Sequence, residues 1–171
     1  MKQLIVLLMI VNLLSCSNRQ VKLDSNSFSE YTIVSDNRAL ADTLNVYFKK
    51  ALGVELPITD NVKGNKKYIH LKYNSDFLID YMSLNFSEHS ITIQGNNSKM
   101  LSYGVYDFIE EFLGVRWYST DLTVVPEAAS INIPLEKEII YKPSVTTRTV
   151  HSRLFYKDSS FADKLKVSNE A

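Results

Sequence analysis

The side chains most able to do chemistry in this 171-residue chain lie in one acidic stretch, where Asp107, Glu110 and Glu111 fall within five residues. Two carboxylates can act as the acid and the base of a hydrolysis when they face each other across the bond that breaks. Glu110 and Glu111 are adjacent, so on a helix their side chains point about 100° apart and cannot form such a pair. We therefore prefer to interpret this stretch as a solvated acidic face, with an arginine such as Arg116 as its partner.

Other residue types with catalytic or metal-binding chemistry are scattered along the chain. His70, His89 and His151 lack the short ligand spacing of a zinc site. No glycine-rich phosphate loop follows a predicted strand, and no serine lies in a nucleophile elbow. The sequence therefore predicts no catalytic residue, no metal site and no cofactor.

The tripeptide Arg116-Trp117-Tyr118 is a candidate binding feature, since aromatic rings can stack on sugar rings. Trp117, the only tryptophan, is thus a candidate substrate-binding residue. Its position shortly after Gly114, which is expected to end a helix, favours burial in the core or at a seam with a following domain. Both interpretations stay open from the sequence, with the packing interpretation preferred.

A helix beginning at Ser98 and ending before Gly114 must position these side chains. Apolar residues recur every three or four positions on one face of it: Leu101, Val105, Phe108, Ile109 and Phe112. A second apolar row, with Tyr103, Tyr106 and Leu113, lies off that face, so the helix is predicted to be covered on two sides. Ser98 is the expected N-cap, and Gly114 the expected left-handed C-terminal residue. Gly104, in mid-helix, predicts close approach of another backbone.

An earlier segment has the same arrangement. A strand over 31–34 leads through Ser35 or Asp36, the expected caps, into an amphipathic helix that Gly53 ends. The strand over 90–94 leads in the same way into the helix that Gly114 ends, at an offset of sixty to sixty-one residues. The two units are predicted to place both helices against one sheet, whether they arose by duplication or by chance. Further strands are expected over 68–73, 77–86, 123–126 and 130–134.

The N-terminus has the pattern of an export signal. Met1-Lys2 precedes an apolar run from Leu4 to Leu14, shorter than the about 20 residues that span a membrane. Leu13-Leu14-Ser15-Cys16 is similar to a bacterial lipobox, which implies that Cys16 is lipidated and anchors the chain to a membrane of the cell envelope. An ordinary signal peptide is the alternative. We expect a signal peptide over 1–16 and a polar tether over 17–29.

The composition excludes two classes of protein. The chain has 19 basic and 19 acidic residues, so it lacks the basic stripe of a nucleic-acid-binding surface. With 171 residues it is too short for a (β/α)8 barrel, which needs about 250. An apolar content of 45% predicts a folded core.

An ordered set of motifs carries a family resemblance. These motifs are Tyr103–Glu110 (YGVYDFIE), Leu113–Tyr118 (LGVRWY), Val124–Pro126 (VVP) and, upstream, Tyr31–Val34, the helix ending at Gly53 and Leu56-Pro57-Ile58. The set resembles the domain that precedes the catalytic barrel in bacterial α-glucuronidases, in family 20 β-hexosaminidases and in related uncharacterised glycosidase-like lipoproteins of Bacteroidetes. The resemblance implies an α+β fold, a mixed β-sheet with two main helices packed on one face. It also implies that this domain, over 30–141, does no chemistry itself.

The segment Lys142–Arg148 resembles the entry to the first barrel strand, so 142–171 is interpreted as the start of a truncated catalytic barrel. In family 20 enzymes an arginine at the spacing of Arg148 binds sugar hydroxyls. This chain lacks the aromatic residue that precedes that arginine, so the alternative is a charged residue near a strand end.

These observations favour a non-catalytic accessory domain of an exported glycoside hydrolase-like lipoprotein involved in glycan degradation. Its expected partners are a glycan, through the parent barrel, and a membrane, through Cys16. Two alternatives are a free-standing carbohydrate-binding lipoprotein and a small hydrolase in its own right.

Overall fold

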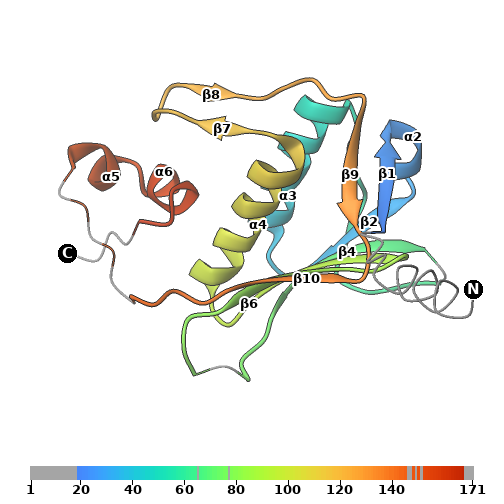
Figure 1. Cartoon of the computed structure of the whole chain (residues 1–171), viewed down its shortest axis with the longest axis horizontal. Coiled ribbons are helices and arrows are strands. Elements are labelled where there is room, and N and C mark those ends of the chain that lie inside the picture. The colour runs from blue at the N-terminus through green and yellow to red at the C-terminus, as the bar shows by residue number, and fades with distance from the viewer. Residues whose placement is uncertain are drawn as a thin grey trace, which may run out of the picture.

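The structure, a computed structural model, describes residues 19–64, 66–76, 78–145, 148, 150 and 152–167. A six-stranded sheet carries both long helices on one face (Figure 1). A small two-stranded sheet and a short hairpin lie beside the helices. The fold is therefore α+β with a mixed sheet, which confirms the predicted fold class.

The strands of the central sheet lie in the order β10, β5, β6, β4, β2 and β3. In that order their bounds are Lys137–Tyr141, Met82–Phe86, Ser90–Gly95, Lys67–Tyr73, Tyr31–Ser35 and Ile58–Thr59. β6, β4, β2 and β3 are parallel, whereas β5 is antiparallel to both of its neighbours. The carboxyl ends of β2, β4 and β6 thus meet at one edge of the sheet, where the chain leaves β2 and β6 to enter the two long helices.

The sheet register sorts side chains by polarity onto its two faces. Ile33, Ile69 and Ile91 align across β2, β4 and β6, and none of them is exposed. Thr92 of β6, on the opposite face, aligns with His70 of β4. The apolar face therefore forms the core with the helices.

The long helices are α3 (Arg38–Leu52) and α4 (Ser98–Leu113), and each is capped by an asparagine. The Asn37 side chain accepts a hydrogen bond from the amide of Leu40, and the Asn97 side chain accepts one from that of Met100. The caps predicted at Ser98 and at Ser35 or Asp36 were therefore wrong. Asparagine caps as well as serine does, and only these two residues reach the third amide of their helix.

The glycines at the helix ends behave as predicted. Gly53 and Gly114 both have φ near 70° and end α3 and α4 in the left-handed conformation. Gly104 does mark a close approach, but the closest group is a side chain, because a Cβ there would lie 2.9 Å from Ile93 Cγ2.

Residues 20–28, most of the expected tether, are instead part of the fold. β1 (Gln20–Asp24) pairs antiparallel with β9 (Ser130–Pro134), and α2 (Ser25–Phe28) follows β1. Phe28 is completely buried, with its ring centroid 4.7 Å from that of Phe48. The strand depends on pairing with residues more than a hundred positions away, which a local polar sequence does not reveal.

The remaining elements follow α4. β7 (Arg116–Trp117) and β8 (Thr123–Val124) form a hairpin, and α5 (Arg153–Lys157) and α6 (Ser159–Lys164) close the described chain. α6 packs on α4 through Phe161 and Ala162, which are 3% and 1% exposed. Within the described residues, none of the helices has the length and apolarity needed to cross a membrane.

Candidate functional site

The acidic stretch of α4 is held in structural contacts. A terminal nitrogen of Arg116, Nη1, lies 3.8 Å from Glu110 Oε1 and donates a 2.7 Å hydrogen bond to the Glu110 carbonyl. Asp107 pairs with Lys166, which follows α6. Burial raises the pKa of Asp107, although the hydrogen bond from Lys166 opposes the shift. The predicted arginine partner is therefore confirmed for Glu110, whereas Asp107 lies under the C-terminal segment and is not part of a solvated face.

Trp117 lies in the core. It is 6% exposed, and its Nε1–H donates a 3.1 Å hydrogen bond to the Tyr47 hydroxyl on α3. Its ring makes edge contacts with Tyr47 and with Tyr106 of α4, at centroid distances of 6.0 and 5.6 Å. This environment favours the interpretation of Trp117 as a packing residue, because protein covers the indole faces that a sugar would need.

Arg148 lies against a different element. It donates a hydrogen bond to the Tyr141 hydroxyl at the end of β10, and its guanidinium carbon lies 5.4 Å from the centre of that ring. Its role in binding sugar hydroxyls stays a prediction. Trp117, against α3 and α4, and Arg148, against β10, contact separate parts of the fold. Cys16, the predicted lipidation site, lies outside the described residues.

The two described histidines, His70 and His89, lie on a strand and beside a cavity. Burial lowers the pKa of His70, which lies on β4 with its ring 5.7 Å from that of Tyr68. His89 lines a cavity of about 390 Å³ with Glu30, Lys66 and Lys67, and His151 lies outside the described residues. No group of three or more potential metal ligands occurs within the part of the chain that the structure describes.

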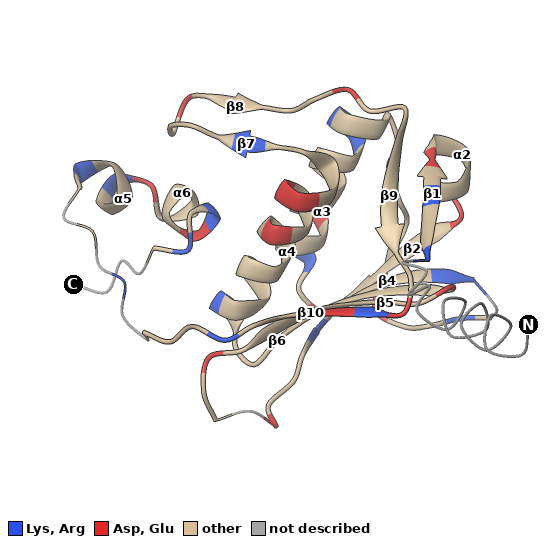
Figure 2. Cartoon of the chain, in the orientation of Figure 1, with Lys and Arg blue, Asp and Glu red and all other residues tan. Residues whose placement is uncertain are grey.

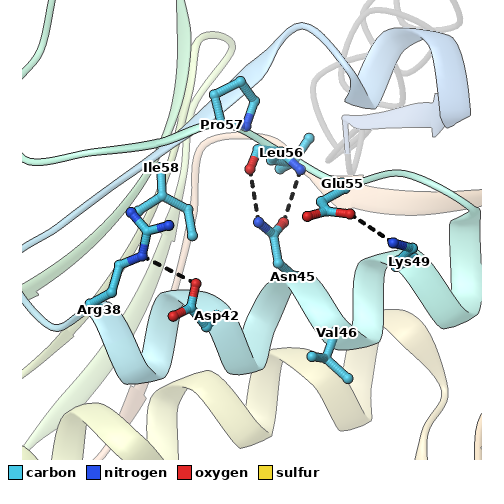
Figure 3. A pocket seen from close by; sticks show the side chains of 9 residues that line it. All are labelled: Arg38, Asp42, Asn45, Val46, Lys49, Glu55, Leu56, Pro57 and Ile58. Atoms are coloured by element: carbon cyan, nitrogen blue, oxygen red, sulfur yellow. Dashed lines mark hydrogen bonds and ion pairs between the residues drawn. The ribbon is translucent and has the colours of Figure 1, made fainter.

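A cleft of about 410 Å³ separates α3 from the segment that enters β3 (Figure 3). Asn45 closes its floor, because its side chain donates to the Leu56 carbonyl and accepts from the Leu56 amide at 2.8 and 2.9 Å. The remaining polar walls are two exposed ion pairs, Arg38–Asp42 at 3.2 Å and Lys49–Glu55 at 2.9 Å. The polar groups that line the cleft thus form hydrogen bonds and ion pairs with one another. We therefore assign these groups a structural role.

A second cavity, of about 550 Å³, lies where the two long helices begin. We call it the helix-start pocket; it is lined by Asn37, Ala39, Leu40, Ser98, Lys99, Ser102, Ser159 and Asp163. Burial raises the pKa of Asp163, and the positive charge of Lys99 opposes that shift. Sequence reasoning missed this pocket, although two asparagines sixty residues apart, each following a parallel strand, were the available signal.

Next to that pocket, Tyr103 has an unusual environment. Its hydroxyl is buried and has no hydrogen-bond partner among the described residues. Burial raises the pKa of Tyr103 to about 12. The hydroxyl therefore stays protonated and carries an uncompensated desolvation cost.

Outside the acidic stretch of α4, charges of both signs alternate over the molecule (Figure 2). Lysine, arginine and acidic residues are interspersed over the helices and strands (Figure 2). This distribution agrees with the equal numbers of basic and acidic residues in the chain.

Comparison with solved structures identifies the fold. The chain is similar to a GH115 4-O-methyl-α-glucuronidase with specificity for decorated arabinogalactans, at 18% identity and a TM-score of 0.55, over 75% of this chain and 19% of that one. It is also similar to a GH20 β-N-acetylhexosaminidase from Streptomyces coelicolor A3(2), at 15% identity and a TM-score of 0.54, over 78% and 26%. A GH20 exo-β-N-acetylglucosaminidase from Vibrio harveyi matches at 17% identity and a TM-score of 0.50, over 78% and 18%.

The chain thus spans about a fifth to a quarter of the length of these enzymes. The matched portion is N-terminal, which is consistent with their N-terminal accessory domain and with the resemblance stated from the sequence. No protein-family model and no curated protein sequence matches the chain. At these identities the likeness establishes the fold.

Proposed function

We propose that this chain is a non-catalytic accessory domain of an exported glycoside hydrolase-like lipoprotein, and that the parent protein degrades glycans. The shared fold supports this proposal, because three glycoside hydrolases contain it as a minor part of their length. The internal contacts of Asp107 and Glu110 agree with a domain that does no chemistry itself.

The observation that carries the proposal is a set of exposed apolar side chains on the β7–β8 hairpin and the α5–α6 segment. The β7–β8 hairpin and the α5–α6 segment lie toward the same end of the view, where the described chain finishes (Figure 1). Both expose large apolar side chains: Tyr118, Leu122 and Val124 on the hairpin, and Leu154, Tyr156 and Leu165 on the segment. Such surfaces mark interaction sites in soluble proteins, and a barrel continuing from this end of the chain is the partner that we propose for it.

Sequencing the DNA downstream of the codon for Ala171 tests this proposal. We expect an open frame of about 250 residues or more with alternating strand and helix patterns. When that segment is expressed as a continuation of this chain, it should protect the hairpin and α5–α6 from hydrogen exchange. A frame with no barrel pattern would overturn the proposal, and so would turnover of aryl glycosides by the 171-residue chain alone.

The lipid anchor is a separate part of the proposal. We expect Cys16, the only cysteine of the chain, to incorporate labelled palmitate when the chain is expressed in a bacterium. The Cys16→Ala variant should incorporate none. Secretion of an unlabelled, cleaved protein would instead favour an ordinary signal peptide.

A free-standing carbohydrate-binding module is the weaker candidate. The indole that would stack on a sugar is 6% exposed and its nitrogen is occupied by Tyr47. We therefore expect no shift of tryptophan fluorescence on addition of oligosaccharides.

A further inference from the structure

The face of the central sheet opposite the long helices carries a straight row of polar side chains. α3 and α4 both pack on the other face (Figure 1). The register aligns Glu138 of β10 with Asn85 of β5. It also aligns Thr92 of β6 with Asn85 on one side and with His70 of β4 on the other. Neighbouring strands lie about 4.8 Å apart, so these four residues, which we call the polar row, extend over about 14 Å.

Three members of the polar row, Asn85, Thr92 and Glu138, line a cavity of about 300 Å³, which we call the sheet-face pocket. Its other walls are Phe86, Ser87, Ser90, Glu136 and Lys137. Glu136 Oε1 lies 3.8 Å from Arg19 Nη1 in an exposed ion pair. The other two charges of the pocket, those of Glu138 and Lys137, have opposite signs. The pocket therefore has no surplus charge, which favours a neutral ligand over an ion.

Contacts beneath the pocket fix the orientation of Asn85. The hydroxyl of Ser83, which is completely buried, accepts hydrogen bonds from Asn85 Nδ2 at 3.1 Å and from Gln94 Nε2 at 2.9 Å. Asn85 Nδ2 also donates to Glu138 Oε1 at 3.2 Å, and the Tyr81 hydroxyl donates to the same oxygen at 3.4 Å. Among the described residues, Asn85 Oδ1 and Glu138 Oε2 are left as acceptors without a partner. Because these contacts hold both acceptors in place, a ligand would lose little affinity to their ordering.

Thr92 and His70 add groups that can both donate and accept. Both side chains are partly exposed, and neither has a hydrogen bond to another residue in the described part of the chain. Burial lowers the pKa of His70, so at neutral pH its ring is uncharged and has one donor and one acceptor nitrogen. Each hydroxyl of a polyol can likewise donate one hydrogen bond and accept others. Neighbouring hydroxyls of a sugar therefore match the sequence of groups along the polar row.

We propose that the sheet-face pocket and the polar row bind a neutral oligosaccharide that lies across the strands. Asn85 Oδ1 and Glu138 Oε2 accept hydrogen bonds from the sugar unit in the pocket, while Thr92 and His70 contact the next unit. The row extends beyond the pocket, so the ligand is longer than one sugar. The choice of a glycan among polyols rests on the proposed function, in which the parent protein degrades glycans. Trp117 has no part in this site, because it lies in the core against α3 and α4.

The test is a titration of the full 171-residue chain, purified in a mild detergent, with cellotriose, maltotriose, xylotriose and triacetylchitotriose. Backbone amide NMR shifts of Asn85, Thr92 and Glu138 report on the pocket, and that of His70 reports on the row. We expect saturable shifts in the millimolar range with at least one trisaccharide, and weaker binding of its monosaccharide. Calcium chloride and sodium sulfate should produce no saturable shift at these amides.

Three outcomes of the titration would overturn the proposal. The first is the absence of saturation with all of the trisaccharides. The second is saturation that is confined to amides outside the pocket and the row. The third is saturation with calcium but not with the sugars, which would indicate a cation site.

Variants make the test specific. Thr92→Val removes the hydroxyl and keeps the shape of the side chain, so it should weaken trisaccharide binding about threefold to tenfold, the size expected for one hydrogen bond. Thr43→Val on α3 is the matched control, because the Thr43 hydroxyl bonds to the Ala39 carbonyl away from the sheet. It should leave sugar binding unchanged.

Ser83 is proposed as a positioning residue, and a double-mutant cycle tests this role. Ser83→Ala should weaken trisaccharide binding in the native chain, because it frees the Asn85 amide to rotate. In a chain that already carries Asn85→Ala, the same substitution should weaken binding no further. Equal weakening in both backgrounds would contradict the positioning role.

Thr92→Val keeps the proposal falsifiable even where Ser83→Ala disturbs folding, since valine is well suited to a strand. Unchanged trisaccharide binding in Thr92→Val contradicts the site. The result is also separate from the test of the proposed function. Sugar binding by a chain without a downstream barrel would support this site and overturn the accessory-domain proposal, whereas a barrel without sugar binding at these amides would overturn this site alone.

Discussion

The two strand–helix units of this fold have the same ends and different surroundings. In each, an asparagine caps the helix and a glycine with φ near 70° ends it. α3 keeps an exposed face, on which Asp42, Val46 and Lys49 contact solvent. The residues sixty positions later, Ser102, Tyr106 and Ile109, are all buried.

The difference arises from what packs on each helix. α4 lies between the sheet, α3 and α6, so its outer face is covered as well as its inner face. Among the residues that the structure describes, no equivalent of α6 covers the face of α3 that carries Val46, which is 48% exposed. The repeated unit therefore determines where a helix begins and ends, while a later part of the chain determines how much of it is buried.

The largest expected effect comes from the same substitution in the two helices. Val105 of α4 is completely buried, so Val105→Ala should lower the free energy of unfolding by about 2 kcal/mol through lost burial and a residual cavity. Val46→Ala, on the open face of α3, should change it by less than about 0.5 kcal/mol. Urea denaturation followed by the fluorescence of Trp117 measures both.

Equal losses in the two variants would contradict the proposed difference between the helices. They would mean that another element covers the outer face of α3 in solution.

Much of this architecture could be predicted from the sequence, because its signals are local. The apolar spacing of both helices and the alternation in β6 depend on residues a few positions apart, as do the two terminating glycines. The two apolar rows of α4 also indicated that this helix is buried on two sides. These predictions hold because each element shows its buried face in its own residues.

The parts that escaped prediction depend on distant partners. β1 exists because it pairs with β9, and β10 because it pairs with β5, although neither strand has a strong pattern of its own. The ion pair between Asp107 and Lys166 joins positions that no local spacing relates. The helix-start pocket is formed by two helices and α6, so no single stretch of sequence contains its signal.

The two terminating glycines give the next largest effect. Both adopt a left-handed conformation, so alanine at either position should cost about 1 kcal/mol. A Cβ on Gly53 meets nothing within 4 Å, whereas one on Gly114 would lie 3.2 Å from Pro126 Cγ. Gly114→Ala should therefore cost more, about 2 kcal/mol in total. Thermal denaturation of the pair checks the order, and a larger loss in Gly53→Ala would contradict it.

Two buried tyrosines should respond to loss of the hydroxyl with opposite signs. Tyr47→Phe on α3 removes the acceptor for the Trp117 indole N–H and should destabilise the fold by about 1 kcal/mol. Tyr103→Phe on α4 removes a hydroxyl that has no partner among the described residues, so stability should stay the same or rise by up to about 1 kcal/mol. Chemical denaturation of both variants compares them directly. A clear loss in Tyr103→Phe would reveal a hydrogen-bond partner for that hydroxyl in solution.

The smallest effect concerns the pH dependence that α6 imposes on α4. Burial raises the folded-state pKa of Asp107 above 3.8, so the folded chain binds more protons than the unfolded chain between 3.8 and that raised value. The free energy of unfolding should therefore fall as pH rises through this window and stay lower above it. Asp107→Asn removes this contribution, so it should flatten the pH profile and change stability at pH 7 by less than about 1 kcal/mol. Asp163→Asn, on the α6 side of the contact, should flatten the profile in the same direction, because burial raises the pKa of Asp163 too. A large loss of stability at pH 7 in Asp107→Asn would instead mean that the ion pair with Lys166 outweighs the cost of burying the carboxylate.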